Sequence, residues 1–109
     1  MGIPLSVSRG LEQHGGIDGL KTALPDDKDL TAAAHIHRAL SDPSRVKILL
    51  LLVRQPLCPC VLKEFVRMSD SKLSYHLKVL REAGVIEQTK EKNWVIYSAT
   101  DDGKKYAMC

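Results

Sequence analysis

One stretch of this chain constrains its fold more than any other: the segment SDSKLSYHLKVLREAGVIEQTKEKNWVIYS, residues 69–98. It opens with Ser69 and Asp70, whose side chains are of the kind that caps helices. A stripe of leucines at helical spacing follows, consisting of Leu73, Leu77 and Leu80. Gly84 stands just past the stripe, where a left-handed residue closes a helix. The segment therefore predicts an amphipathic helix with one buried face and one outward face.

The second half of this segment predicts a two-stranded hairpin. Val85 and Ile86 precede a charged turn at 90–93, and Trp94 opens a second apolar run after it. Two apolar runs on either side of a short polar turn are typical of a β-hairpin. Asn93 is expected to take the positive backbone angle in this turn, because asparagine tolerates that conformation.

The residues on either side of this segment predict further helices. They are expected at 30–40, 43–54 and 59–67, with a short last helix capped by Asp101. Asp42 followed by Pro43 suits the cap and first position of a helix. The helix that follows is apolar almost all round after Lys47, as expected of a central core helix. Pro56 should end it.

Residues 1–28 form a region of different character. They hold five of the seven glycines, and their apolar residues follow no sustained period. A flexible or partly ordered N-terminal arm is therefore predicted. Residues 29–109 should form one compact domain, since a chain of 109 residues has room for a single core. The fold class is mainly α with a small β-hairpin (α+β), a winged helix-turn-helix in the order α-α-α-α-β-β-α.

Two short helices followed by a hairpin predict that the outward face of the second helix binds double-stranded DNA. Hydroxyl groups near its start can read base edges, while basic side chains neutralise phosphates. The candidate DNA-binding residues are Ser71, Lys72, Ser74, Tyr75, His76, Lys78 and Arg81, with Lys90 and Lys92 at the hairpin tip. His76 falls beside the leucine stripe, so a phosphate contact and a packing role are both open. A winged helix that binds another protein is the alternative, because a net charge of +3 does not require a polyanionic partner.

The run from Arg38 to Ser98 resembles the ArsR/SmtB family of metal- and arsenic-responsive repressors. The similarity is carried by LSDPSRVKIL, by S-x-x-LS-x-HLKVLREAG and by the ending WVIYS. The resemblance implies a homodimer formed through the first and last helices, which binds a palindromic operator with two reader helices about 34 Å apart. It also implies an inducer that weakens DNA binding. An enzyme is not expected, because no nucleophile is paired with a base and no phosphate loop is present.

The three cysteines are Cys58, Cys60 and Cys109. An odd number of cysteines and the lack of a secretory segment favour free thiols in a reducing cytoplasm. By resemblance, LCPCVL occupies the frame LCVCDL of arsenic- and cadmium-sensing members, so Cys58 and Cys60 match the inducer ligands of the family. Thiolates select soft species such as As(III), Sb(III) and Cd(II), and a helix N-terminus lowers thiol pKa. No obligatory cofactor is expected.

The pattern around the cysteines departs from the family in ways that leave the site open. Val61 replaces an acidic residue, and Lys63 stands where some arsenic sensors carry a third cysteine. Arsenite favours three thiolates, so Cys109 and, more remotely, His14 are the candidates for a third ligand. The same cysteine pair can instead serve a thiol-based redox or sulfide-responsive repressor, or it can be packed without any chemistry.

Overall fold

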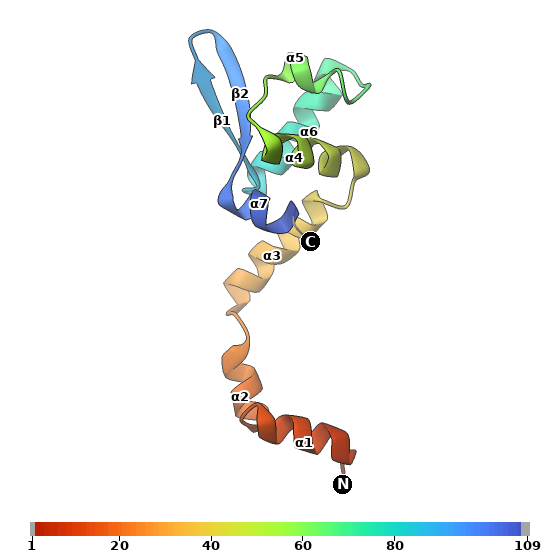
Figure 1. The fold of residues 1–109 in the computed structure, drawn as a ribbon, viewed down its shortest axis with the longest axis vertical. Coiled ribbons are helices and arrows are strands. Elements are labelled where there is room, and N and C mark those ends of the chain that lie inside the picture. Colours follow the sequence, from red (N-terminus) through yellow and green to blue (C-terminus); the bar gives the residue numbers. More distant parts are fainter. Residues whose placement is uncertain (1, 108–109) are drawn as a thin grey trace. The chain divides into compact units, whose positions relative to one another are not determined.

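The computed structural model describes residues 2–107 and divides into two compact units, one ending at Thr31 and the other beginning at Ala32. The helices are α1 (Leu5–Gln13), α2 (Gly16–Ala23), α3 (Asp27–Ala39), α4 (Pro43–Arg54), α5 (Pro59–Leu62), α6 (Asp70–Glu82) and α7 (Asp101–Ala107). The strands are β1 (Ile86–Glu91) and β2 (Trp94–Ala99). From α3 onward the order is the predicted one, and the winged helix-turn-helix fold is confirmed (Figure 1).

The first unit contains the helices α1 and α2, in the arm that the sequence predicts to be flexible or partly ordered. Gly15 and Gly16 separate α1 from α2, with φ of 84° and 76° in the left-handed region that glycine adopts easily. The sequence does not indicate these helices clearly, because short apolar repeats such as Val7 and Leu11 are interrupted by glycines that weaken the helical pattern. Neither helix has a buried residue, so this unit has no core of its own.

The core of the second unit lies between α4, α6 and the hairpin. Its most buried side chains are Ile48, Leu49, Leu62, Leu80, Val85 and Ile86. The predicted leucine stripe of α6 is confirmed, since Leu73, Leu77 and Leu80 are all buried. Burying a leucine side chain contributes about 1.5–3 kcal/mol. These leucines therefore fix which face of α6 remains in solvent.

The helices α4 and α6 both begin at the predicted caps. The Asp42 carboxylate accepts hydrogen bonds from the backbone N–H of Ser44 at 2.8 Å and of Arg45 at 3.2 Å, and Pro43 takes the first helical position. Desolvation would raise the pKa of Asp42, but these two bonds, aided by the positive charge of Arg45, hold it below its ordinary value. The Ser69 hydroxyl accepts from the Lys72 N–H at 3.2 Å and starts α6 in the same way.

The hairpin pairs β1 and β2 antiparallel, from Ile86 opposite Ala99 to Glu91 opposite Trp94. Its two-residue turn places the positive φ of 57° at Lys92 and not at Asn93, so that detail of the prediction is wrong. A two-residue hairpin turn requires a positive φ at its first central residue, whatever side chain stands there.

Three helix ends differ from the sequence prediction. The third predicted helix, 59–67, ends at Leu62, after which Glu64 and Phe65 donate to carbonyls three residues back in tighter turns. α3 starts at Asp27, three residues before the predicted start at Leu30. At α7 the cap is Thr100, whose hydroxyl accepts from the Gly103 N–H at 3.0 Å, while Asp101 is already helical.

Gly103 holds α7 against the base of the hairpin. A Cβ atom at this position would lie 2.0 Å from the Val85 carbonyl oxygen, so no larger residue fits without a shift of the backbone. Thr100 adds to the contact by donating its hydroxyl hydrogen to the Gly84 carbonyl at 2.6 Å. The last helix and the end of α6 are thereby joined at one point (Figure 1).

Within residues 2–107, none of the helices has the length and apolar character needed to cross a membrane.

Candidate DNA interface and cysteine site

The outward face of α6 carries most of the predicted DNA-binding residues. Ser71, Lys72, Ser74, Tyr75 and Lys78 are all exposed, opposite the buried leucine stripe. The first four lie in the first two turns of a helix whose N-terminus is capped by Ser69. This end of a recognition helix is the one that usually contacts base edges. The structure thus brings hydroxyls and an ammonium group together on one solvent-facing surface.

His76 does not belong to that surface. It is only 5% exposed, and its Nδ1 atom lies 3.2 Å from the Arg45 Nη1 atom. Arginine can only donate, so Nδ1 of His76 must accept and the imidazole carries its proton on Nε2. The Nε atom of Arg45 also donates to the Ala39 carbonyl at 2.6 Å. Of the two roles left open by the sequence, burial favours packing: His76 ties α6 to α4 through Arg45 and is unavailable to a phosphate.

The remaining basic candidates differ in the contacts that their side chains make. Lys78 lies 3.8 Å from the Glu82 carboxylate one turn later, an exposed pair that restrains it only weakly. Arg81 donates a hydrogen bond to the side chain of Gln88 on β1, so it links α6 to the hairpin. Lys90 and Lys92 are exposed near the hairpin turn. Arg81 is therefore a link between elements as well as a basic side chain.

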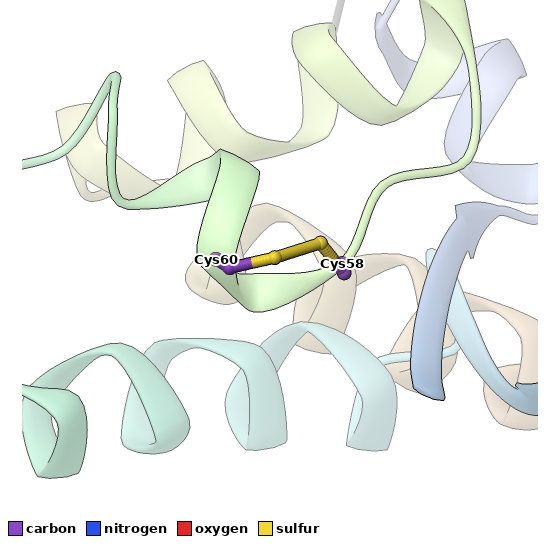
Figure 2. The surroundings of a disulfide bond; sticks show 2 residues. All are labelled: Cys58 and Cys60. Carbon is purple, nitrogen blue, oxygen red and sulfur yellow. A yellow bond between two sulfur atoms is a disulfide. The ribbon is translucent and has the colours of Figure 1, made fainter. Parts of the chain in front are cut away.

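The cysteine site lies at the entrance to α5. Cys58 is the residue before the helix, with extended backbone at φ −85° and ψ 161°, and Cys60 is in the first turn after Pro59. This change of backbone conformation brings the two Cα atoms to 5.4 Å, within the range that a disulfide spans. The two sulfurs are joined in a disulfide (Figure 2). The prediction of free thiols is therefore wrong for this pair, because the extended residue before the helix turns both side chains to the same side.

The sequence offers two candidates for a third ligand. Cys109 lies outside the described residues. His14 is exposed in the first unit, where its Nδ1 atom is 2.8 Å from the Gly10 carbonyl oxygen. Within residues 2–107 there is no cluster of three or more histidine, cysteine, aspartate or glutamate side chains that could hold a metal ion.

Two contacts that the sequence did not predict tie α5 to its neighbours. Leu57, immediately before Cys58, exchanges two backbone hydrogen bonds with Tyr97 of β2, at 3.0 and 2.9 Å. Lys63, immediately after α5, forms an ion pair with Asp70, the first residue of α6. The cysteine-bearing turn is thus attached to the hairpin on one side and to α6 on the other. A single bridge between a loop residue and a strand leaves no periodic signal in a sequence.

Three comparisons with known proteins bear on this arrangement. Residues 42–88 match the family described as bacterial regulatory protein, arsR family. An uncharacterized HTH-type transcriptional regulator of Methanocaldococcus jannaschii is 35% identical over 74 residues, which are 67% of this chain and 83% of the relative. An arsenical resistance operon repressor of Staphylococcus xylosus is 37% identical over 71 residues, 65% of this chain and 68% of that protein.

Solved structures give the same picture for the fold. Reduced HlyU from Vibrio cholerae superimposes with a TM-score of 0.68 at 28% identity, covering 75% of this chain and 87% of that one. For several other curated relatives, the matched part of this chain spans only 49% to 63% of their length.

Proposed function

Because the chain belongs to the ArsR family of bacterial transcriptional regulators, we propose that it represses transcription by binding operator DNA through α6, and that thiol chemistry at Cys58 and Cys60 releases it. The observation that carries this proposal is the position of the cysteine pair. It begins the helix that is attached both to β2, through Leu57, and to α6, through Lys63. The relatives are transcriptional regulators and not enzymes.

In the proposed complex, the start of α6 lies in the major groove. Ser71, Ser74 and Tyr75 contact base edges, while Lys72 and Lys78 neutralise phosphates. Lys90 and Lys92 reach the DNA backbone or the minor groove from the hairpin turn. Arg81 contacts phosphate while it keeps the hairpin aligned with the helix. The exposure of these side chains on one face supports the assignment.

We propose that the repressor acts as a homodimer in the cytoplasm, formed through α3 and α7. The imidazole of His37 packs edge-on against the Tyr106 ring, with ring centroids 5.2 Å apart, so these two helices already form one surface within a protomer. Beside it, Leu50 of α4 is 48% exposed although it is a large apolar residue. Exposed apolar area of this kind is typical of a surface that is covered by a partner.

The first candidate signal is a thiophilic inducer that binds the reduced pair. The names of relatives, among them arsenical resistance operon repressors and a cadmium resistance regulatory protein homolog, support As(III), Sb(III) or Cd(II). Two sulfurs at the start of a helix are favourable for this, since soft ions prefer thiolate ligands. We propose Cys109 as the residue that would complete a three-ligand site.

The second candidate signal is oxidation or sulfide chemistry at the same residues, and the disulfide favours it. A pair that closes into a disulfide within one turn needs no partner thiol from another subunit. Formation of the bridge fixes the backbone of residues 58–60, and the two ties of α5 would carry the change to the hairpin and to α6. A coupling of about 1–3 kcal/mol between the two sites would change operator affinity about 5- to 150-fold.

The test is operator binding followed by fluorescence anisotropy, with DNA from the promoter next to the gene of this protein. Reduced protein should bind in a salt-dependent manner. Arsenite, antimonite or cadmium is then added to one set of reduced samples, and peroxide or persulfide to a parallel set. At least one of the two sets should show release of the protein from its operator. Cys58→Ser and Cys60→Ser should abolish the response, and Cys109→Ser should abolish only a response that needs a third thiolate. A protein that lacks Cys58 and Cys60 but still responds to every signal would disprove the proposed sensor.

A further inference from the structure

The inner face of α6 contains one polar side chain among its leucines. The buried residues of this helix are Leu73, His76, Leu77 and Leu80, and His76 is 5% exposed. A polar group in an apolar environment is costly unless it is hydrogen-bonded. The partner of His76 is Arg45 of α4, whose Nη1 atom lies 3.2 Å from Nδ1 of the imidazole. This contact is the polar part of the packing between α6 and α4.

Arg45 is held in place by contacts with two other elements. Its Nε atom donates to the carbonyl of Ala39, the last residue of α3, at 2.6 Å. Its backbone N–H donates to the Asp42 carboxylate at 3.2 Å, at the cap of α4. The planar guanidinium group therefore donates to His76 from a fixed position, and it joins α3, α4 and α6 at one point.

The contact between Arg45 and His76 requires a neutral imidazole. A guanidinium group only donates hydrogen bonds, so Nδ1 of His76 must offer a lone pair. When the imidazole is protonated, both ring nitrogens carry hydrogen and this acceptor is lost. Two positively charged side chains would then face each other across the same contact. The bonded arrangement holds one proton fewer than an arrangement with charged His76, so acid favours the broken contact.

The other groups around His76 determine how its charged form is accommodated. The groups that face His76 from α4 and its cap are Arg45 and Asp42, and from α6 it is Tyr75. The Asp42 carboxylate interacts electrostatically with His76 and attracts an imidazolium group. Asp42 therefore makes the charged form attainable, while Arg45 makes that form incompatible with the hydrogen bond.

The proposed DNA-contacting surface begins one residue away from His76. The side chain of Tyr75 is 59% exposed, and its ring lies edge-on to the imidazole of His76 with ring centroids 5.9 Å apart. Ser71 and Ser74 precede it on the same exposed face. A change in how His76 packs on α4 would therefore move the part of α6 that is proposed to contact base edges.

We propose that Arg45 is a positioning residue for operator recognition, which holds α6 against α4 while His76 is neutral and releases it when His76 is protonated, so that mild acid weakens operator binding. This inference rests on the proposed binding of operator DNA by α6. It does not depend on Cys58 or Cys60. Histidine is the side chain whose charge ordinarily changes between about pH 5 and pH 8, so the effect is expected in that range.

The experiment measures operator affinity by fluorescence anisotropy from about pH 7.5 to about pH 5.5, the range in which histidine ordinarily titrates. The protein is kept reduced with a phosphine and free of metal, so that the state of the cysteines is constant. A duplex with the operator bases in scrambled order is measured in parallel. The ratio of the two affinities removes the general effect of added positive charge at low pH. Asp42 stays ionised throughout, since its pKa lies below its ordinary value of 3.8.

We expect the affinity ratio of the wild type to fall about tenfold over this range, because one hydrogen bond from a charged donor is lost. His76→Asn keeps an acceptor near the position of Nδ1 that does not titrate, so its ratio should stay constant. Arg45→Met removes the donor, so its ratio should be low at both ends of the range and should not fall further. His35→Asn, a matched change at an exposed histidine of α3, should retain the full fall.

A second measurement needs no DNA. Nitrogen NMR of protein with isotopically labelled histidine reports which ring nitrogen carries hydrogen. At neutral pH, His76 should carry it on Nε2. Protonation of His76 should be accompanied by faster exchange of the α6 amide hydrogens, since the helix loses a contact with α4. These spectra of the wild type decide the question even where a variant does not fold.

Two results would overturn the inference: a fall in the affinity ratio that survives His76→Asn, or protonation of His76 that changes neither the ratio nor the exchange of α6. Failure of the proposed function has a different signature. Protein whose α6 loosens when His76 is protonated, but which binds no operator at any pH, contradicts DNA binding by α6 and leaves the contact between Arg45 and His76 as described. Protein that binds its operator equally well across the range contradicts only the role of Arg45.

Discussion

The two helices of the proposed DNA-binding pair, α5 and α6, are built in opposite ways. α6 has thirteen residues, a serine cap and four buried side chains on its inner face. α5 has four residues, no side-chain cap, and Leu62 as its buried residue. α6 is therefore held by its cap and by four side chains packed in the core, while α5 is held mainly by Pro59, the cysteine bridge and its contacts with neighbours. Because α5 depends on these contacts for its position, we expect a chemical change at Cys58 and Cys60 to displace α5 more easily than α6.

The largest effect should come from weakening the part of α6 that is held by the core. Leu80 is completely buried, so Leu80→Ala should lower the free energy of unfolding by about 2–5 kcal/mol. The exposed Val61 of α5 provides the matched control, and Val61→Ala should cost less than about 0.5 kcal/mol. Urea unfolding followed by circular dichroism measures both. Equal costs for the two variants would contradict the contrast between the helices.

The next effect concerns the outward face of α6. The double variant Lys72→Ala with Tyr75→Ala should keep the fold and lose about 100-fold in operator affinity, since each lost contact to a base or phosphate is worth about 1–3 kcal/mol. Lys21→Ala, which changes an exposed basic residue on α2, is the control for lost positive charge. Anisotropy at several salt concentrations should show a shallower salt slope for the double variant. Unchanged binding would favour a winged helix that contacts protein.

A smaller effect should follow from removing one of the two contacts that attach α5 to its neighbours. Lys63→Ala removes the ion pair with Asp70, which is exposed and worth at most about 1 kcal/mol. The prediction is that reduced protein binds its operator almost normally, while the change in affinity on oxidation or inducer binding shrinks up to about fivefold. Lys78→Ala, which removes the comparable pair with Glu82 inside α6, should leave that response unchanged. The ratio of operator affinities in the two states is the quantity to measure.

The smallest effect concerns the pH dependence of stability that the Asp42 cap gives to α4. The folded-state pKa of Asp42 lies below its ordinary value of 3.8, so its contribution is fully present above that value and is lost as pH falls through the folded-state pKa. Asp42→Asn keeps a capping side chain that does not titrate. The melting temperature of the wild type should therefore fall more steeply than that of Asp42→Asn below about pH 4. Parallel curves would show that this cap contributes no pH dependence.

The features that could be predicted from the sequence are those with a local cause. The caps at Asp42 and Ser69, the leucine stripe of α6 and the hairpin are each specified by neighbouring residues. The convergence of Cys58 and Cys60 has a local cause as well, because the extended backbone of Cys58 leads directly into the helix that Pro59 opens. The early end of α5 was not, because Val61 to Phe65 read as a helix and the tighter turns depend on how the following loop packs.

Other features have causes far away in the sequence. The burial of His76 depends on Arg45, which lies 31 residues earlier, and the position of Leu57 depends on Tyr97. A pocket beside the cysteines is formed by two elements that no pattern in the sequence places side by side. The helices of the first unit were missed because glycines interrupt their short apolar repeats.

The contact of Gly103 with the Val85 carbonyl has a mechanical consequence. Because Gly103 packs directly on the carbonyl of Val85, the residue before β1, a displacement of the base of the hairpin would have to displace α7 as well. Leu57 is bridged to Tyr97 of β2, so the segment before α5 is attached to the same hairpin. In the proposed homodimer, such a displacement would therefore reach Tyr106 and the surface that α3 and α7 form.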